Sequence, residues 1–320
     1  MKGKHFIEVI SRNMHYSIEL SRNITIISGD SGTGKSSLRR MLYEYLRLDG
    51  RVEFTIKCSA KFRVFNGSLI TDEQLFTLKD TIVIVDEDAT YLRSENFAKF
   101  VLKSSNYFVF MTRSPLSMLP YSFKSIYKLE TRFEFGKYIT ENIELFINGN
   151  VSKINSIITE DSNSGRQMLK ACYDIVLDSE INGNSTLVHR AYKNLNNGPL
   201  LLFADGAALG PYIHSLQELI NTHNGKVVLW APESFEYILL TSGIVYRNDV
   251  MNILRSPSDQ IEPSIFSSWE RFFTWLVMDI TSKYPGHEYS KHVLKAWYLS
   301  KENIEKFKKA IPEEIRVLLP

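Results

Sequence analysis

Residues 24–36 read Ile24-Thr25-Ile26-Ile27-Ser28-Gly29-Asp30-Ser31-Gly32-Thr33-Gly34-Lys35-Ser36, an apolar run that passes directly into a glycine-rich stretch. The run before the first glycine has the β-branched, apolar character of a buried strand. Residues 29–36 match the pattern G-x-x-x-x-G-K-[ST] at every fixed position. Residues 37–46 follow with apolar side chains at helical spacing. Strand, loop and helix therefore occur in the order that a phosphate-binding loop requires.

In such a loop the glycines let successive backbone N–H groups point into one concavity, toward which the following helix turns its N-terminus. Lys35 is expected to reach the outer phosphates of a triphosphate, and the Ser36 hydroxyl to ligate Mg²⁺. The alternative is a glycine-rich turn that matches the pattern by chance. The residues predicted to contact the nucleotide are Gly29, Asp30, Ser31, Gly32, Thr33, Gly34, Lys35, Ser36 and Ser37.

Composition sets only wide limits on fold and function. The chain has 320 residues, of which 44% are hydrophobic, enough for about two packed domains. Its 38 Lys and Arg against 36 Asp and Glu leave a net charge of +2, so bulk charge favours neither nucleic acid nor membrane as a partner. No apolar run approaches about 18 residues, and residues 1–8 are charged and strand-like, so we expect a cytoplasmic protein with no membrane contact. Cys58 and Cys172 show no metal-site spacing and are interpreted as reduced thiols.

The hydrophobic pattern predicts an α/β chain in three blocks. Residues 1–148 are expected to form a nucleotide-binding domain on a partly parallel sheet, residues 151–235 a smaller α/β domain, and residues 236–320 a mainly helical region. The strands predicted are Phe6–Ile10, Tyr16–Leu20, Ile24–Ser28, Val52–Lys57, Thr81–Val85, Tyr107–Met111, Ser125–Leu129, Ile154–Thr159, Ser185–Val188, Leu200–Ala204 and Lys226–Trp230.

Residues 78–88, Leu78-Lys79-Asp80-Thr81-Ile82-Val83-Ile84-Val85-Asp86-Glu87-Asp88, form an apolar run that ends in acids, the form of a Walker B element. The end of this strand would place Asp86 at the carboxyl edge of the sheet, where it can orient Mg²⁺ or its water. Glu87 is the candidate to polarise the attacking water. The alternative is an acidic strand end that merely meets solvent.

Residues 107–113 are another buried-type strand, with a polar exit at Thr112 and Arg113. Thr112 stands where a sensor residue of ATPases contacts the γ-phosphate. Arg113 is expected either to reach phosphate or to pair with an acid of the Asp86 cluster. A simple salt bridge at a strand end is the alternative for Arg113.

The loop at residues 29–36, the acids Asp86 and Glu87 and the polar exit at Thr112 together resemble P-loop ATPases of the ASCE type, the division that holds the ABC and AAA+ enzymes. The strand pair 16–20 and 24–28 is more similar to ABC or SMC-type heads, although no LSGGQ-like signature separates Ser36 from Asp86. The resemblance covers residues 1 to about 145. It implies ATP and Mg²⁺ as cofactors, ATP hydrolysis, and a site completed by a second copy of the chain or a protein partner.

A second acidic pattern follows the first block. Residues 154–160 are an apolar strand that ends in Glu160, and residues 200–205 repeat this scheme with Asp205. Two parallel strands that end in carboxylates can hold a divalent ion, which neutralises a scissile phosphodiester and activates water. The alternative is a small α/β domain with solvated acids at its strand ends.

Residues 152–235 resemble a Toprim domain, the metal-binding fold of topoisomerases, bacterial primases, OLD-family nucleases and ribosomal RNA maturases. Glu160 matches the first-strand glutamate of that family, and Asp205 the first aspartate of its D-x-D pattern. Ala207 stands where the second aspartate is expected. The resemblance implies that Glu160 and Asp205 bind metal and act in phosphodiester cleavage. Asp161, Glu233 and Glu236 are substitutes for the missing ligand.

Two functions follow. In the first, an ATPase gates a Mg²⁺-dependent Toprim-like nuclease that acts on nucleic acid, a parts list similar to OLD-family nucleases, some of which defend against phage. In the second, favoured by Ala207, the chain is a nucleotide-dependent switch or scaffold whose second domain binds a partner and cleaves nothing. The lysines of the C-terminal block, which include Lys291 and Lys295, are interpreted as a solvated helix face.

Overall fold

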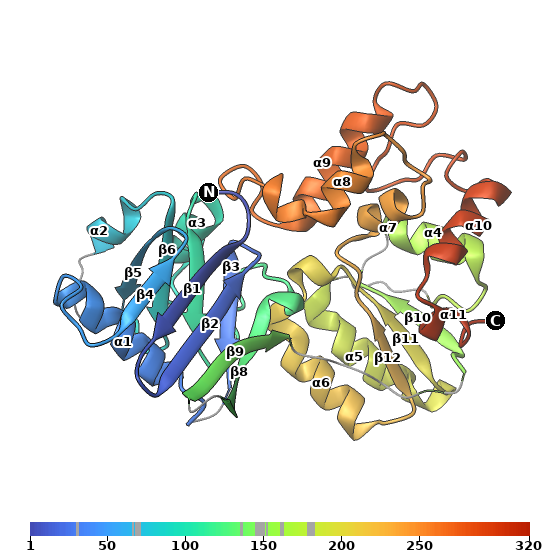
Figure 1. Ribbon diagram of the computed structural model, residues 1–320. Helices are drawn as coiled ribbons and strands as arrows, with labels where there is room; N and C mark the ends of the chain where they lie inside the picture. The colour runs from blue at the N-terminus through green and yellow to red at the C-terminus, as the bar shows by residue number, and fades with distance from the viewer. Residues whose placement is uncertain are drawn as a thin grey trace. The chain divides into compact units, whose positions relative to one another are not determined.

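The computed structural model describes residues 1–29, 32–65, 67, 72–134, 137–144, 151, 153–160, 163–177 and 183–320. The chain divides into two compact units, Met1–Leu145 with Ser256–Ser267 and Phe146–Arg255 with Ser268–Pro320 (Figure 1). Most of the helical region that the sequence separates from residue 236 onward therefore groups with the second unit. Within the described residues, no helix has the length and apolar character needed to cross a membrane.

The first unit is built on a mixed sheet of nine strands among its described residues, in the order β4-β1-β2-β9-β8-β3-β7-β6-β5. β8, β3, β7, β6 and β5 run parallel to one another, whereas β4, β1 and β2 pair antiparallel, as do β8 and β9. The strands are β1 (His5–Ile10), β2 (Met14–Leu20), β3 (Ile24–Ser28), β4 (Thr55–Cys58), β5 (Lys61–Phe65), β6 (Thr81–Asp86), β7 (Tyr107–Met111), β8 (Ile126–Glu134) and β9 (Lys137–Glu144).

Helices cover both faces of the parallel half of this sheet. Along β7, Tyr107 and Val109 point to the core that α1 (Lys35–Arg47) shares with the sheet. The intervening Phe108 packs edge to face on Phe97 of α3 (Glu95–Lys103), on the opposite face. This burial on both faces explains why the central strands β3, β6 and β7 are mainly apolar. The unit also contains α2 (Asp72–Phe76) and the short helices η1 (Phe123–Ser125) and η5 (Pro257–Asp259).

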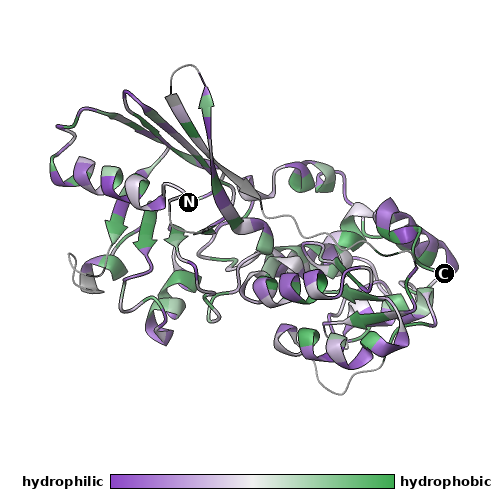
Figure 2. Ribbon diagram, turned by 90° about the horizontal axis from the view of Figure 1, so that it is seen from below, coloured by the Kyte–Doolittle hydropathy of each residue, from purple (hydrophilic) through white to green (hydrophobic). Residues whose placement is uncertain are grey.

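The second unit has a parallel sheet in the order β10-β11-β12, formed by Ser156–Thr159, Leu200–Phe203 and Val227–Trp230. α5 and α6 pack on one face of the sheet, and α4, α7 and α10 gather on the other (Figure 1). Figure 2 shows the strands as apolar and the helices as divided between an apolar and a polar side. The helices are α4 (Ser164–Cys172), α5 (Asn184–Asn194), α6 (Ile213–Thr222), α7 (Phe235–Thr241), α8 (Val250–Arg255), α9 (Trp269–Thr281), α10 (Lys301–Ala310), α11 (Glu313–Arg316), η2 (Leu195–Asn197), η3 (Gly206–Ala208) and η4 (Gly210–Tyr212).

The prediction of an α/β chain with a large, partly parallel sheet is confirmed. The prediction of a strand at residues 185–188 is wrong, because these residues belong to α5. Within that helix Leu187 and Ala191 are buried one turn apart. Residues four positions apart lie on the same side of a helix and also on the same face of a strand, so a short apolar run does not distinguish the two structures. The strands β5 and β9 were not predicted.

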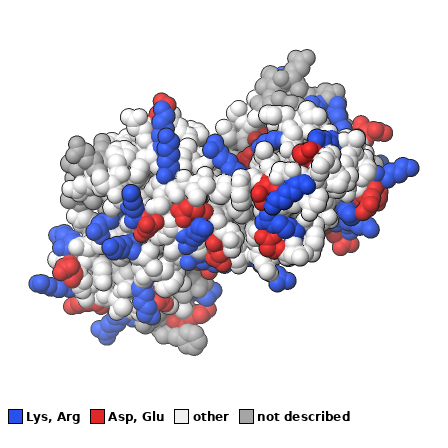
Figure 3. All heavy atoms as spheres, turned by 90° about the horizontal axis from the view of Figure 1, so that it is seen from above, with Lys and Arg blue, Asp and Glu red and all other residues white. Residues whose placement is uncertain are grey.

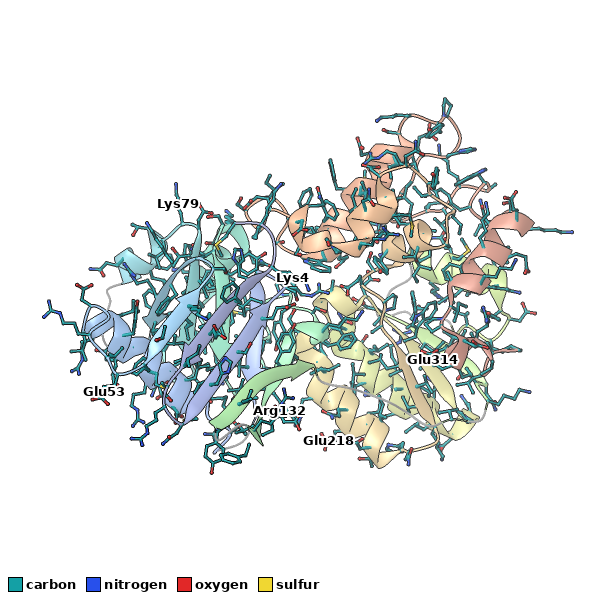
Figure 4. All side chains as sticks on the ribbon, viewed as in Figure 1. Lys4, Glu53, Lys79, Arg132, Glu218 and Glu314 are labelled. Atoms are coloured by element: carbon teal, nitrogen blue, oxygen red, sulfur yellow. The ribbon has the colours of Figure 1, made fainter. Side chains whose placement is uncertain are left out.

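Charged side chains of both signs are mixed on the face of the molecule that Figure 3 presents. Figure 3 shows Lys and Arg interspersed with Asp and Glu on the face it presents. Figure 4 labels exposed examples, among which Lys79, Glu53 and Glu218 point outward. The labelled Lys4 pairs with Glu19 at 2.9 Å.

Candidate functional site

The glycine-rich loop leaves β3 and enters α1 through backbone conformations that only glycine adopts readily. Gly29, Gly32 and Gly34 have φ values of 126°, 91° and 92°. A Cβ atom on Gly34 would also lie 3.1 Å from the hydroxyl oxygen of the buried Tyr16. Sterics therefore require glycine here independently of any ligand. Asp30 and Ser31, which the sequence assigns to the nucleotide, lie outside the described residues.

Lys35 is the first residue of α1, and its ammonium group folds back over the loop. It donates hydrogen bonds to the Gly29 carbonyl and, at 3.1 Å, to the Thr33 hydroxyl. Gly34 caps the helix with left-handed backbone geometry, and no acidic residue lies in the first turn. A positive side chain and the backbone N–H groups of a helix N-terminus thus meet at one point, which favours an anion.

A cavity of about 380 Å³ opens at this loop and brings together segments that are distant in the sequence. The loop and the start of α1 form one side of it. Asp86 and Glu87 enter from the end of β6, and Arg113 follows β7, which lies between β3 and β6. The described residues that line the cavity are Met14, Gly32, Thr33, Gly34, Lys35, Ser36, Ser37, Asp86, Glu87, Met111, Arg113, Thr131 and Tyr138.

Asp86 is held in place from two sides. One of its carboxylate oxygens accepts a hydrogen bond from the Glu87 backbone N–H at 3.0 Å, and the other pairs with the Arg39 guanidinium of α1. Burial raises the pKa of Asp86 above its usual value, although Arg39 acts in the opposite direction. Each carboxylate oxygen can accept more than one hydrogen bond, so Asp86 keeps capacity for a further partner.

Thr112 and Arg113, the two polar residues that follow β7, make different contacts. Arg113 lies 3.6 Å from a Glu87 carboxylate oxygen, and its backbone N–H donates to Glu87 at 3.3 Å. Pairing with an acid of the Asp86 cluster was one of the two roles predicted for Arg113 from the sequence. Thr112 is buried, and its hydroxyl exchanges hydrogen bonds with the backbone of Ser114 at 3.1 and 3.2 Å. Thr112 is not among the described residues that line the cavity.

The β8–β9 hairpin supplies a wall of the cavity that the sequence did not predict. Tyr138 of β9 lies beside Met14 of β2 in the parallel register and opposite Phe133 of β8 in the antiparallel one. The Tyr138 and Phe133 rings are 5.1 Å apart, and their side chains are 51% and 63% exposed. Tyr138 therefore presents a half-exposed aromatic ring at the cavity wall.

In the second unit, Glu160 and Asp205 meet at the carboxyl edge of the small sheet. The Glu160 carboxylate accepts a hydrogen bond from the Asp205 backbone N–H at 3.0 Å, and Asp205 accepts one from the Phe235 backbone N–H, also at 3.0 Å. Burial raises the pKa of Asp205 well above its usual range, and the nearby carboxylates, Glu270 first among them, add to this effect. The sequence correctly anticipated that the two acids share an edge.

A lysine enters this acidic cluster. Lys291 pairs with Glu270 of α9, and its ammonium nitrogen lies 4.0 Å from Asp205 Oδ2. Burial alone would lower the pKa of Lys291, but the Glu270 and Asp205 carboxylates outweigh burial and raise it. The interpretation of Lys291 as part of a solvated helix face is therefore wrong: the residue precedes α10 and points into the cluster. Lys295, by contrast, pairs with the partly exposed Glu288.

Glu236, at the start of α7, is a further buried acid of this cluster. One of its carboxylate oxygens accepts a hydrogen bond from the Tyr289 hydroxyl at 2.7 Å, and Tyr289 is 2.8 Å from the Ser164 hydroxyl. The other oxygen, Oε2, has no hydrogen-bond partner among the described residues. Glu160, Asp205, Glu236 and Lys291 line a cavity of about 20 Å³, room for about one water molecule.

The remaining residues considered as metal ligands take other positions. Ala207 is buried, and its backbone N–H donates to the Glu233 carbonyl at 3.1 Å. The Glu233 side chain is also buried but is not among the described residues that line the small cavity. Asp161 lies outside the described residues. Over the described part of the chain, no three His, Cys, Asp or Glu side chains converge in a way that could hold a metal ion.

Comparison with known proteins adds no relative: no protein-family model matches this chain, and no curated protein or solved structure matches it significantly.

Proposed function

We propose that the chain binds ATP with Mg²⁺ in the 380 Å³ cavity of the first unit and hydrolyses it. The observation that carries this proposal is the composition of the cavity wall. The start of α1, with Lys35 and Ser36, faces the same space as Asp86 and Glu87. Cation, helix N-terminus, hydroxyl and carboxylates are the groups that a triphosphate and its metal require.

The donor set fits Mg²⁺. Ser36 and Asp86 line the same cavity, and both carry oxygen atoms that can ligate a metal ion. Mg²⁺ prefers oxygen ligands and keeps several of its water molecules when it binds to a protein. When bound, Mg²⁺ neutralises charge on the phosphate oxygens. Ser36 would hold it directly, and Asp86 would orient it or one of its waters.

The other residues act on charge and on the attacking water. Lys35 would leave its contacts with Gly29 and Thr33 and bind the outer phosphate oxygens. Glu87 would accept a proton from the water that attacks the γ-phosphate, a role worth about 10² to 10⁴ in rate. Arg113, which pairs with Glu87, is close enough to orient this carboxylate. The role of Thr112 as a phosphate sensor stays a prediction.

The direct test is a titration of the full chain with Mg²⁺ and ATP by calorimetry, together with an assay of phosphate release. We expect saturable binding and release of phosphate above the uncatalysed rate. A folded chain that shows neither at millimolar ATP contradicts the proposal.

We expect the exposed ring of Tyr138 to stack on the adenine base of ATP. Base–aromatic stacking is worth about 1–3 kcal/mol, so replacing Tyr138 by alanine is expected to weaken ATP binding by roughly tenfold. The Tyr138→Phe chain should bind as the wild type does, because it keeps the ring. Binding is measured by calorimetry for ATP and for inorganic tripolyphosphate, which lacks a base.

Tripolyphosphate binding should be unchanged by Tyr138→Ala, since the phosphate loop is intact. A matched control is Tyr246→Ala, which removes a tyrosine of comparable exposure in the second unit. Equal weakening of ATP and tripolyphosphate would show that the ring supports the loop instead of the base.

For the second unit, two functions remain candidates. The first candidate, implied by the resemblance to Toprim domains, is a nuclease that uses Mg²⁺ at Glu160 and Asp205. The alternative, a nucleotide-dependent switch or scaffold that binds a partner without cleavage, is favoured by one contact: the Lys291 ammonium lies 4.0 Å from Asp205 Oδ2, within the cluster that the metal would need. Assays of cleavage of DNA and RNA with Mg²⁺ or Mn²⁺, with and without ATP, distinguish the two functions. Cleavage that is lost in Asp205→Asn would establish the nuclease.

A further inference from the structure

We propose that Arg39 competes with Mg²⁺ for Asp86, so that binding of ATP with Mg²⁺ displaces the Arg39 guanidinium from this carboxylate. Arg39 would then set how tightly the first unit binds the metal-bound form of the nucleotide. The inference rests on the proposed function, because it assumes that Asp86 orients Mg²⁺ or one of its waters. It adds a positioning residue that lies outside the pattern at residues 29–36.

The helix α1 brings Arg39 within reach of Asp86. Arg39 lies four positions after Lys35, so the two side chains leave the same face of the helix one turn apart. Long side chains in a helix lean toward its N-terminus, which directs the guanidinium toward the start of α1. There Nη1 of Arg39 pairs with Oδ2 of Asp86, at the end of β6. Among the described residues Arg39 makes no other ion pair or hydrogen bond.

This ion pair balances the charge that Asp86 would offer to a metal. Oδ1 of Asp86 accepts the Glu87 backbone N–H at 3.0 Å, and the lone pairs that remain can accept another hydrogen bond. The negative charge of the carboxylate, however, is already paired with the guanidinium. The Arg39 and Asp86 side chains are 29% and 13% exposed, so water screens them only in part. A second cation at Asp86 would be repelled by Arg39, which favours exchange of one cation for the other.

A second cavity leaves room for the displaced guanidinium. It has a volume of about 270 Å³, and Arg39 lines it, whereas Asp86 lines the 380 Å³ cavity. A rotation of the Arg39 side chain is therefore sufficient to leave Asp86, and α1 need not move. The described residues that line the second cavity are Ser36, Ser37, Arg39, Arg40, Tyr43 and Val64.

The direction of the effect separates this competition from simple attraction of the nucleotide. If Arg39 only attracted ATP, loss of its charge would weaken ATP binding. If Arg39 competes with Mg²⁺, loss of its charge tightens binding of the metal-bound nucleotide, because the empty site no longer has an ion pair to break. In a chelator no metal competes for Asp86, so ATP binding should not tighten there.

The test measures ATP binding to the full chain by calorimetry, in excess Mg²⁺ and in a chelator, for the wild type and for Arg39→Gln. We expect Arg39→Gln to bind ATP at least about threefold more tightly in Mg²⁺, the size expected for loss of one partly exposed ion pair. Arg39→Met, which keeps an unbranched apolar side chain, should give the same result. In the Asp86→Asn chain, the further change Arg39→Gln should give no gain, because the competing carboxylate is absent.

The matched control is Arg40→Gln, which removes the adjacent arginine of the same helix. Arg40 is exposed and makes no ion pair within the described part of the chain, so its loss should not tighten ATP binding in Mg²⁺. Unchanged or weaker binding by a folded Arg39→Gln chain, or an equal gain in Arg40→Gln, overturns the inference alone. A wild-type chain that binds no ATP in Mg²⁺ contradicts the proposed function, and this inference with it.

Discussion

Replacing Glu87 by glutamine is expected to lower ATP turnover by about 10² or more while leaving ATP binding within about twofold of wild type. Glutamine keeps the shape of the side chain and an oxygen that can accept from the Arg113 N–H, but it cannot take a proton from the attacking water. Phosphate release under saturating ATP measures turnover, and calorimetry in the presence of Mg²⁺ measures binding.

The loss of the ion pair with Arg113 does not account for such an effect. Both side chains are substantially exposed, and exposed pairs contribute little to stability. Glu53→Gln, at an exposed position of the same unit, serves as the control and should leave turnover unchanged. If Asp86→Asn and Glu87→Gln both hydrolyse ATP at the wild-type rate, the assignment of the β6 acids is wrong.

Lys35→Ala is expected to weaken ATP binding or lower turnover by at least tenfold, about 1.4 kcal/mol. The variant removes the positive charge that lies over the glycine-rich loop. It also removes contacts with Gly29 and Thr33, so the melting temperature must be recorded to show that the loop variant folds.

A suitable control for charge is Lys79→Ala, since Lys79 is exposed on the first unit and far along the chain from the loop. It should bind ATP as the wild type does. A folded Lys35→Ala chain with unchanged affinity and turnover would contradict a phosphate-binding role for residues 29–36. The prediction for Tyr138→Ala would then fall as well, because it assumes that ATP binds in the same cavity.

The strands and helices that carry local signals were predictable. β3 and β7 have the predicted bounds, and α1 begins within two residues of the prediction. These segments are buried on both faces or on one regular stripe, so their apolar pattern is continuous. The predicted strand at 185–188 failed because a short apolar run is compatible with either period, and the packing of α5 against β10 and β11 selected the helix.

The sequence by itself determined the loop at residues 29–36 and the acids that end β6, β10 and β11. A glycine-rich turn and an apolar run that ends in an acid are local features, which a short stretch of residues makes visible. Only the tertiary structure brought Tyr138 to the 380 Å³ cavity beside the glycine-rich loop, and only it directed Lys291 toward Asp205, 86 positions away in the numbering. Burial of apolar side chains drives this packing, but it does not specify which polar side chains come into contact. Contacts between distant segments therefore produce no periodic pattern in the sequence.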